Sequence, residues 1–225
     1  GRAGRDGGEG HCLAFYSYKD IEKLEKFMSG KPVAEQEIGN ALLQEVVAYA
    51  ETSMSRRKFM LHYFGEDFDE INGAGANMDD NTRNPKEKQE AKEDVLKLIR
   101  VVQGTHEKFK SKEVVKTLVG KVNAIISSHK TDEKDFFGIG AGKDKGYWMA
   151  LIRQVLVAGY LKKEIEQYGI LHVTKKGVEF LKKPSSFMMT MDHVYNQEND
   201  DAIVSAAKSS GGVADETLLR FLKDL

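Results

Sequence analysis

The chain opens on the segment GRAGRDGGEG, in which two arginines, Arg2 and Arg5, stand three residues apart among glycines. Glycine lets the backbone come close to a ligand, and the planar guanidinium of arginine matches phosphate oxygens with two parallel hydrogen bonds. The segment therefore predicts a group that binds phosphate. The alternative is a turn rich in glycine and arginine that binds nothing.

The sequence contains no recognisable loop for the phosphates of a nucleotide. Such a loop has the pattern G-x-x-x-x-G-K-[ST], in which the final hydroxyl binds magnesium. The nearest match is at Gly142 and Lys143. It fails because Phe137 replaces the first glycine and Asp144 replaces the hydroxyl residue. We therefore expect that this chain alone does not hydrolyse ATP.

Composition indicates a soluble globular protein, with 40% hydrophobic and 31% charged residues in a chain of 225. No run of about 18 apolar residues occurs, so neither a membrane span nor a membrane partner is expected. Cys12 is the only cysteine, which excludes internal disulfides and a zinc site made of several thiolates. This cysteine usage and the lack of a signal peptide favour the cytoplasm.

The charge is unevenly distributed along the chain. Residues 84–186 contain 21 Lys and Arg against 13 Asp and Glu, whereas the other residues contain 13 against 22. A basic region of this kind is the usual electrostatic mark of a protein that binds DNA. The alternative is that lysine-rich helices only keep the region soluble.

Helical periodicity predicts a small antiparallel platform in the first third of the chain. A short buried strand is expected before it, over residues 12–20. The platform helices are expected at residues 20–28, 34–52 and 54–65. In the second of these, four apolar residues fall on one stripe of the helix: Ile38, Leu42, Val46 and Tyr49.

The basic region reads as three helices followed by a β-hairpin, which is the pattern of a winged helix. The acidic segment 67–85, rich in Gly and Asn, is the expected boundary. Alternation on both sides of Tyr168 and Gly169 predicts the hairpin, and a short helix closes it. The helices are expected at residues 88–105, 111–120 and 146–161. The predicted fold class is mainly α with a small β-hairpin wing, a helical platform plus a winged-helix domain.

The start of the third helix is the best candidate for a phosphate clamp. The segment GIGAGKDKG places Lys143 and Lys145 where a helix N-terminus favours an anion. The alternative is a flexible loop that caps the helix. Trp148 is expected in the core, whereas Arg153 and Gln154 are expected to reach solvent or DNA.

The wing supplies the other candidates for DNA contact. Lys162 and Lys163 lie on its first strand, and Tyr168 lies at its tip. An exposed aromatic ring can stack on the end base pair of a duplex. The alternative is that Tyr168 is an ordinary turn residue.

The order of these segments resembles the RecQ family of DNA helicases over nearly the whole chain. GRAGRDG resembles the last helicase motif, SRRKFMLHYFGE resembles the helix that enters the zinc-binding subdomain, and FGIGAGKDKGYWMALIRQVLVAGYL resembles the recognition helix of the winged-helix domain. The implied domains are the tail of the second helicase lobe (1–30), a zinc-binding-like subdomain (31–83), a winged-helix RQC domain (84–190), a flexible linker (191–213) and the start of a truncated HRDC-like domain (214–225).

The resemblance implies part of an ATP-dependent helicase with three-prime-to-five-prime polarity, acting in recombination and repair in the bacterial cytoplasm or nucleoid. Arg2 and Arg5 would then be arginine fingers toward ATP and magnesium held by helicase lobes that precede them. The implied partner is duplex and forked DNA, with Tyr168 as a strand-separating wedge. The rival interpretations are a stand-alone winged-helix DNA-binding regulator and a protein-interaction module, and the sequence names no protein partner.

The resemblance fails at the zinc ligands, where the family has four cysteines. The matching positions are Ser55, Asn72, Gly75 and Met78. None supplies a thiolate, so we expect the subdomain to be free of metal, with an unrestrained loop at residues 73–81. Apolar packing is expected to replace the zinc, through Phe59, Leu61, Tyr63, Phe64, Phe68 and Ile71.

Overall fold

The computed structural model describes residues 7, 8 and 10–195. The chain divides into two compact units, of which one contains residues 1–20 with 194–225 and the other residues 21–193. Arg2, Arg5 and the HRDC-like segment 214–225 lie outside the described residues. Among the described residues, no helix combines the length and the apolar character that a bilayer crossing requires.

The predicted strand over residues 12–20 is not found. Residues 10–17 have no regular secondary structure, and Leu13 and Phe15 are 81% and 93% exposed. Apolar residues alone do not make a strand, because a strand needs a partner for its backbone hydrogen bonds. In the same unit, the ring of Tyr16 meets that of Tyr195 edge to face, with 5.4 Å between the ring centres.

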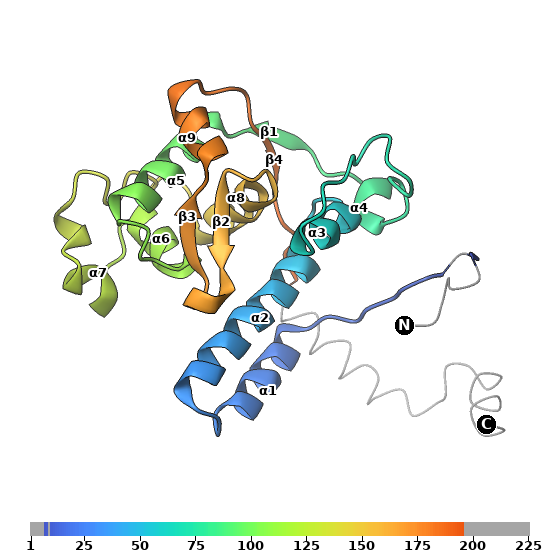
Figure 1. Ribbon diagram of the computed structural model, residues 1–225, viewed down its shortest axis with the longest axis horizontal. Coiled ribbons are helices and arrows are strands. Elements are labelled where there is room, and N and C mark those ends of the chain that lie inside the picture. Colours follow the sequence, from blue (N-terminus) through green and yellow to red (C-terminus); the bar gives the residue numbers. More distant parts are fainter. Residues whose placement is uncertain (1–6, 9, 196–225) are drawn as a thin grey trace, which may run out of the picture. The chain divides into compact units, whose positions relative to one another are not determined.

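The platform contains the helices that the sequence predicted. Figure 1 shows α1 and α2 side by side as a helical hairpin, followed by α3 and the short α4. A Cβ on Gly39 would lie 1.8 Å from Met28 Cε, so a larger residue here would require the end of the flexible Met28 side chain to move. The bounds are α1 (Tyr18–Met28), α2 (Val33–Glu51), α3 (Arg56–Tyr63) and α4 (Asp80–Arg83).

Most of the apolar stripe of α2 is exposed to solvent. Ile38, Leu42 and Val46 are 38%, 41% and 53% exposed, whereas Val47 and Ala48 are buried. The helix was therefore predicted correctly, but the face that it buries was not. A neighbouring face of α2 meets the wing, through residues that include two glutamates.

The second part of the larger unit is a winged-helix domain. Its three main helices and hairpin confirm the predicted fold class, mainly α with a small β-hairpin wing. The bounds are β1 (Lys88–Glu90), α5 (Lys92–Gly104), α6 (Ser111–Leu118), α7 (Ala124–Ser128), the 3-10 turn η1 (Thr131–Glu133), α8 (Lys145–Val157), β2 (Leu161–Glu164), the 3-10 turn η2 (Ile165–Gln167), β3 (Ile170–Val173), α9 (Lys175–Lys182) and β4 (Met188–Thr190).

One apolar core joins α5, α6, α8 and the wing. Leu98, Phe109 and Leu171 are almost fully buried in it. Trp148 is 0% exposed, and its indole Nε1 donates a hydrogen bond to the Gly140 carbonyl oxygen at 3.0 Å. Trp148 is therefore a core residue, as the sequence predicted.

Two short antiparallel sheets complete the domain. The wing pairs Leu161 with Val173 and Glu164 with Ile170, which confirms the predicted hairpin, although its turn is longer than expected. The second sheet pairs β1 with β4 and was not predicted. Its first strand, residues 88–90, was assigned to the start of a helix, because three exposed polar residues give no strand pattern and the partner strand lies about 100 residues further along the chain.

Candidate nucleic-acid interface and the zinc-binding positions

The N-terminus of α8 carries two exposed cations beside a carboxylate. Lys143 and Lys145 are exposed, and the Lys143 ammonium lies 4.7 Å from the centre of the Tyr147 ring. Asp144 caps the helix by accepting the Tyr147 N–H at 2.7 Å. One of the free backbone donors is therefore already used, and attraction of a phosphate to this end depends mainly on the two lysines.

Tyr147 anchors this helix start to α5. Its hydroxyl donates a hydrogen bond to Asp94 at 2.6 Å. Burial, together with this bond, raises the pKa of Tyr147. The ring is thus a neutral and fixed support for Lys143 rather than a group that titrates.

The expectation that Arg153 and Gln154 reach solvent is wrong. Arg153 is 9% exposed and bonds Glu51 at 2.9 Å, and it also bonds Asp192. Gln154 is 5% exposed and exchanges two hydrogen bonds with the backbone of Thr190, at 2.6 and 3.0 Å. The reason is that α8 is the central helix of the domain, so β4 and the segment after it cover the side that a lone helix would leave open.

The same segment corrects the start of the predicted linker at residue 191. Lys86 Nζ donates to the Asp192 carbonyl oxygen at 2.8 Å, and the His193 N–H donates to the Glu51 carbonyl oxygen at 2.7 Å. Burial raises the pKa of Asp192, although the Arg153 charge opposes the rise. Residues 192 and 193 are therefore structural and are not part of a flexible linker.

The lysines of the wing have different surroundings. Lys162 is largely exposed, with its ammonium 3.7 Å from Glu164. Lys163 is only 20% exposed and pairs with Glu45 of α2 at 2.5 Å. Tyr168 is 38% exposed at the tip, with the Lys110 ammonium 5.6 Å from its ring centre. Of these wing residues, Lys162 is the one most open to a phosphate.

Sequence reasoning missed the residue that holds the base of the wing. Glu107 accepts the Val173 N–H at 3.0 Å and contacts His172 at 2.9 Å. His106 and Glu107 have φ values of 54° and 56°, in the left-handed region that non-glycine residues seldom adopt. This unusual backbone conformation directs the Glu107 carboxylate toward β3. No pattern in the sequence predicts it.

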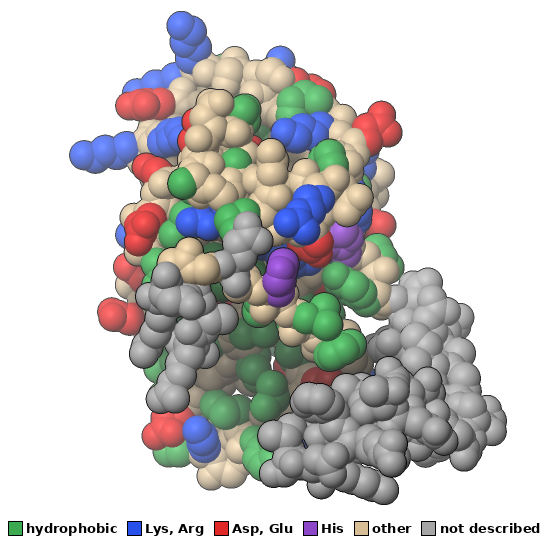
Figure 2. All heavy atoms as spheres, turned by 90° about the vertical axis from the view of Figure 1, so that its right-hand side faces the viewer, with side chains coloured by type: hydrophobic (Ala, Val, Ile, Leu, Met, Phe, Trp, Pro, Cys, Tyr) green, Lys and Arg blue, Asp and Glu red, His purple; other side chains and the backbone are tan. Residues whose placement is uncertain are grey.

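Charge is mixed on the face of the molecule that Figure 2 shows. This view is from the right-hand side of Figure 1, and Lys and Arg side chains are interspersed there with Asp and Glu. The excess of cations in residues 84–186 does not form one continuous basic surface on this face.

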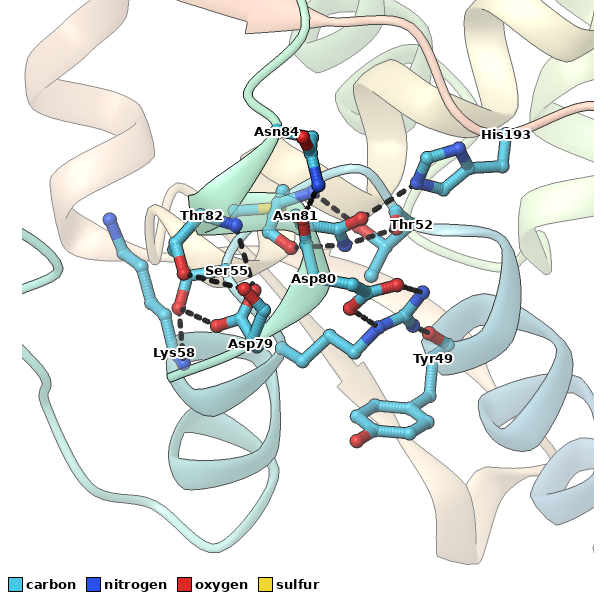
Figure 3. Close-up of polar contacts among 12 residues, drawn as sticks. Tyr49, Thr52, Ser55, Lys58, Asp79, Asp80, Asn81, Thr82, Asn84 and His193 are labelled. Atoms are coloured by element: carbon cyan, nitrogen blue, oxygen red, sulfur yellow. Dashed lines mark hydrogen bonds and ion pairs between the residues drawn. The ribbon is translucent and has the colours of Figure 1, made fainter. Parts of the chain in front are cut away.

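Two of the zinc-ligand positions are occupied by other hydrogen bonds. Ser55 caps α3 by accepting the Lys58 N–H at 3.3 Å, and its hydroxyl donates to the Asp79 carboxylate at 3.1 Å (Figure 3). The Asn72 amide donates to Asp69 at 3.2 Å. Both side chains are thus committed to neighbours within the subdomain.

The other two positions, Gly75 and Met78, lie beside the exposed side chain of Arg57. A Cβ on Gly75 would lie 2.6 Å from Arg57 Nη1 and 2.7 Å from Met78 Sδ. Arg57 also lies 5.5 Å from the centre of the Phe68 ring. A zinc ion here would meet a guanidinium of like charge and no thiolate. The residues do not fit zinc, and the described residues include no group of three or more His, Cys, Asp or Glu arranged for a metal.

A polar clamp joins the end of this loop to the start of α3, and Figure 3 shows its members pointing toward one another. Arg56 holds Asp80 through two bonds of 2.5 and 2.9 Å, and the hydrogen bond from Arg56 lowers the pKa of Asp80. The buried Asn81 amide donates to the carbonyl oxygens of Thr52 and Met54 at 2.8 and 2.7 Å. With the bond from Ser55 to Asp79, three consecutive residues each bind the segment 52–56.

The expected apolar replacement for zinc is therefore wrong for three of the six side chains. Phe59 is buried, but Tyr63, Phe64 and Ile71 are 48%, 69% and 78% exposed. The loop is too short and too polar to bury these side chains, and its closure comes from hydrogen bonds instead. An acidic cap such as Asp79 before a helix can be recognised in a sequence. The contact of Asn81 with His193 at 2.7 Å cannot, because the two residues are 112 positions apart.

Comparison with known proteins agrees with this architecture. The family model of the RQC domain matches residues 85–198, and that of the RecQ zinc-binding domain matches residues 18–81. The ATP-dependent DNA helicase RecQ of Pasteurella multocida is 26% identical over 196 residues, which are 86% of this chain and 30% of that protein. An ATP-dependent DNA helicase of Schizosaccharomyces pombe is 30% identical over 172 residues, 74% of this chain and 13% of that protein.

A third relative matches a shorter stretch with higher sequence identity. The RecQ-like DNA helicase blm-1 of Caenorhabditis elegans is 41% identical over 75 residues, which are 31% of this chain and 7% of that protein. The fold defines a winged-helix domain preceded by a helical subdomain. The RQC match covers just over half of the residues of this chain, so the chain belongs to the RecQ family. It spans about 30% of the length of its bacterial relatives.

The zinc positions lead to a first prediction. Elemental analysis of the purified chain should find far less than one zinc per molecule, because an arginine and hydrogen-bonded side chains occupy the site. A metal chelator should leave the melting temperature unchanged. One zinc per chain, or a lower melting temperature with chelator, would contradict the prediction.

Proposed function

We propose that this chain is the DNA-binding portion of a RecQ-like ATP-dependent helicase, which binds duplex and forked DNA and assists strand separation. The observation that carries the proposal is the pair of exposed cations, Lys143 and Lys145, at the start of α8 in a domain that matches the RQC family. Cations that project into solvent beside a helix N-terminus are suited to the phosphate backbone and carry no sequence preference. This suits an enzyme that acts on DNA of any sequence.

The proposal extends to the complete enzyme. Arg2 and Arg5 would act as arginine fingers on ATP and magnesium bound by helicase lobes, so the chain alone would not hydrolyse ATP. The enzyme would move with three-prime-to-five-prime polarity in recombination and repair, in the cytoplasm or the nucleoid. Tyr168 would serve as the wedge at the duplex end. These assignments are supported by the family resemblance and by the relatives, which are named as ATP-dependent DNA helicases.

The test of DNA binding replaces both lysines. Lys143→Ala with Lys145→Ala should weaken binding to a fluorescent duplex by about tenfold and reduce the slope of log Kd against log salt by about 2, because each phosphate contact releases about one counterion. Fluorescence anisotropy over a salt series measures both quantities. Lys26→Ala with Lys31→Ala removes the same charge outside the RQC domain and should have a much smaller effect.

The same salt series separates the rival functions. A surface that binds protein through apolar contacts loses little affinity as salt rises, whereas binding to phosphates weakens steeply. If the double substitution at Lys143 and Lys145 leaves the affinity and the salt slope unaltered, these two lysines do not form the phosphate clamp. If the unaltered chain does not bind a duplex, the proposal fails as a whole.

A further inference from the structure

The tip of the wing is docked on the platform helix α2. The Lys163 ammonium pairs with Glu45 at 2.5 Å, and both side chains are about four-fifths buried. Nearby, Lys110 pairs with Glu37 at 3.1 Å. Three cationic or aromatic groups that could bind DNA, Lys110, Lys163 and Tyr168, are thus gathered at α2.

One face of α2 supplies the whole contact. Glu37, Ala41 and Glu45 are four residues apart, so they lie on the same side of the helix. Ala41 lies between the two glutamates, and a Cβ on Gly169 would lie 4.0 Å from its Cβ. Gly169 has a φ of 84°, a value suited to glycine, and this turn brings the backbone of the tip onto α2. We call this contact of Glu37, Ala41 and Glu45 with Lys110, Lys163 and Gly169 the α2 latch.

The latch pairs carboxylates with the cations that a phosphate would bind. A carboxylate and a phosphate oxygen satisfy a lysine in the same way, so one lysine cannot serve both at full strength. Lys163 is the clearest case, because its ion pair is largely shielded from solvent. Lys110 lies at the edge of the contact, with its ammonium also over the Tyr168 ring.

We propose that the α2 latch is an autoinhibitory contact, in which Glu45 pairs with Lys163 of the wing and Glu37 pairs with Lys110 beside it, and DNA must displace both glutamates. The inference rests on the proposed function, since it presupposes that the wing binds DNA. It explains how a wedge at Tyr168 is kept from engaging DNA until a duplex is present. The Lys110–Glu37 pair is about two-fifths exposed and is therefore easily exchanged, whereas the Lys163–Glu45 pair is largely shielded and holds the contact more firmly.

The first test removes the carboxylates. Glu37→Gln with Glu45→Gln should tighten binding to a fluorescent duplex by about three- to tenfold at moderate salt. Loss of any two negative charges also favours DNA binding, so the matched control is Glu22→Gln with Glu35→Gln. Glu22 lies on α1 and Glu35 lies on α2, and neither forms an ion pair with a described residue of the wing. The latch variant must exceed this control.

The second test closes the latch covalently. Ala41→Cys with Gly169→Cys places two Cβ atoms at a separation that a disulfide spans, about 3.5–4.5 Å. The exposed Cys12 is first replaced by serine to prevent other pairings. Lys163 Cε lies 3.3 Å from the new Cβ, but it is the end of a flexible chain. The oxidised form should bind the duplex about three- to tenfold more weakly than the same variant after reduction, so strain at Gly169 affects both arms equally.

The outcomes separate the latch from DNA binding itself. If the unaltered chain binds no duplex, the proposed function fails. If it binds, but the glutamine variant matches its control and oxidation changes nothing, the latch is overturned while DNA binding stands. Failure of the disulfide to form in the folded chain, checked by mass spectrometry, would overturn the contact itself.

Discussion

Replacing Arg153 with methionine is expected to lower the free energy of unfolding by about 3–5 kcal/mol near neutral pH. The guanidinium is 10% exposed and lies between Glu51 and Asp192. Methionine fills a similar volume but leaves the buried Asp192 carboxylate without its ion-pair partner, which is the costly part of the change. Urea unfolding monitored by circular dichroism measures the difference.

The pH dependence of the stability of Arg153→Met tests whether the buried Asp192 carboxylate causes the loss. Burial raises the pKa of Asp192 in the folded protein, so its stabilising contribution is present at low pH and is lost as pH rises through the folded pKa. Without Arg153 the main group that opposes that rise is lost and only the Lys86 charge still opposes it, so the carboxyl should take up a proton more readily. The deficit of Arg153→Met should therefore shrink as pH falls towards the ordinary carboxyl pKa of 3.8.

A surface pair provides the control for Arg153. Arg100 bonds Asp135 at 2.5 Å, but the two side chains are 58% and 74% exposed. Arg100→Met should cost less than about 1 kcal/mol, because water and salt already screen this pair. Equal losses for the two variants, or a loss at Arg153 that does not change with pH, would show that the buried carboxylate is not the cause.

Arg153 also affects the function proposed for the wing. It fixes α8, which carries the wing, to the end of α2, which carries the latch glutamates. Loss of this joint should loosen the position of the wing relative to α2 as well as destabilise the fold. The buried arginine that sequence analysis assigned to DNA is thus better explained as a structural link between the platform and the winged helix.

Local signals in the sequence predicted most of the elements. Helical periodicity located α1, α2, α3, α5, α6, α8 and α9, and Trp148 was correctly placed in the core. The glycine-containing turn correctly located the wing. These features depend on neighbours within about one or two turns, which a sequence displays directly. Errors arose where a residue's environment depends on a distant partner.

The candidate site shows the same limit. Lys163 looks like an exposed strand lysine until Glu45 is placed beside it, 118 residues earlier in the chain. Gln154 looks like a solvent-facing helix residue until β4 covers it. The zinc positions were found by resemblance, but residues 79–81, which close the subdomain instead, were not. Their bonds reach back to residues 52–56, and periodicity does not report such pairings.

Replacing Asn81 with aspartate is expected to cost about 2–4 kcal/mol of folding free energy near neutral pH. The Asn81 amide is buried and donates to two carbonyl oxygens, those of Thr52 and Met54. Aspartate has the same shape, but it directs a charged oxygen at those two acceptors. The change therefore reverses the hydrogen-bond polarity without opening a cavity, and thermal unfolding measures its cost.

The decisive comparison for Asn81 combines a neighbouring control with acid. Asn84→Asp makes the same chemical change three residues away, where the exposed amide donates one long bond of 3.4 Å to the Asp80 carbonyl oxygen, and it should cost far less.

The carboxyl introduced at residue 81 should have a pKa above its unfolded value, because burial and two facing carbonyls disfavour its charge. Its protonated form is favoured in the fold, so the deficit of Asn81→Asp should decrease as pH falls through that raised pKa. A cost equal to that of Asn84→Asp would mean that residues 79–81 do not close the subdomain in place of zinc. A large cost of Asn81→Asp, together with a melting temperature that chelator does not change, would identify these hydrogen bonds as the replacement for the metal.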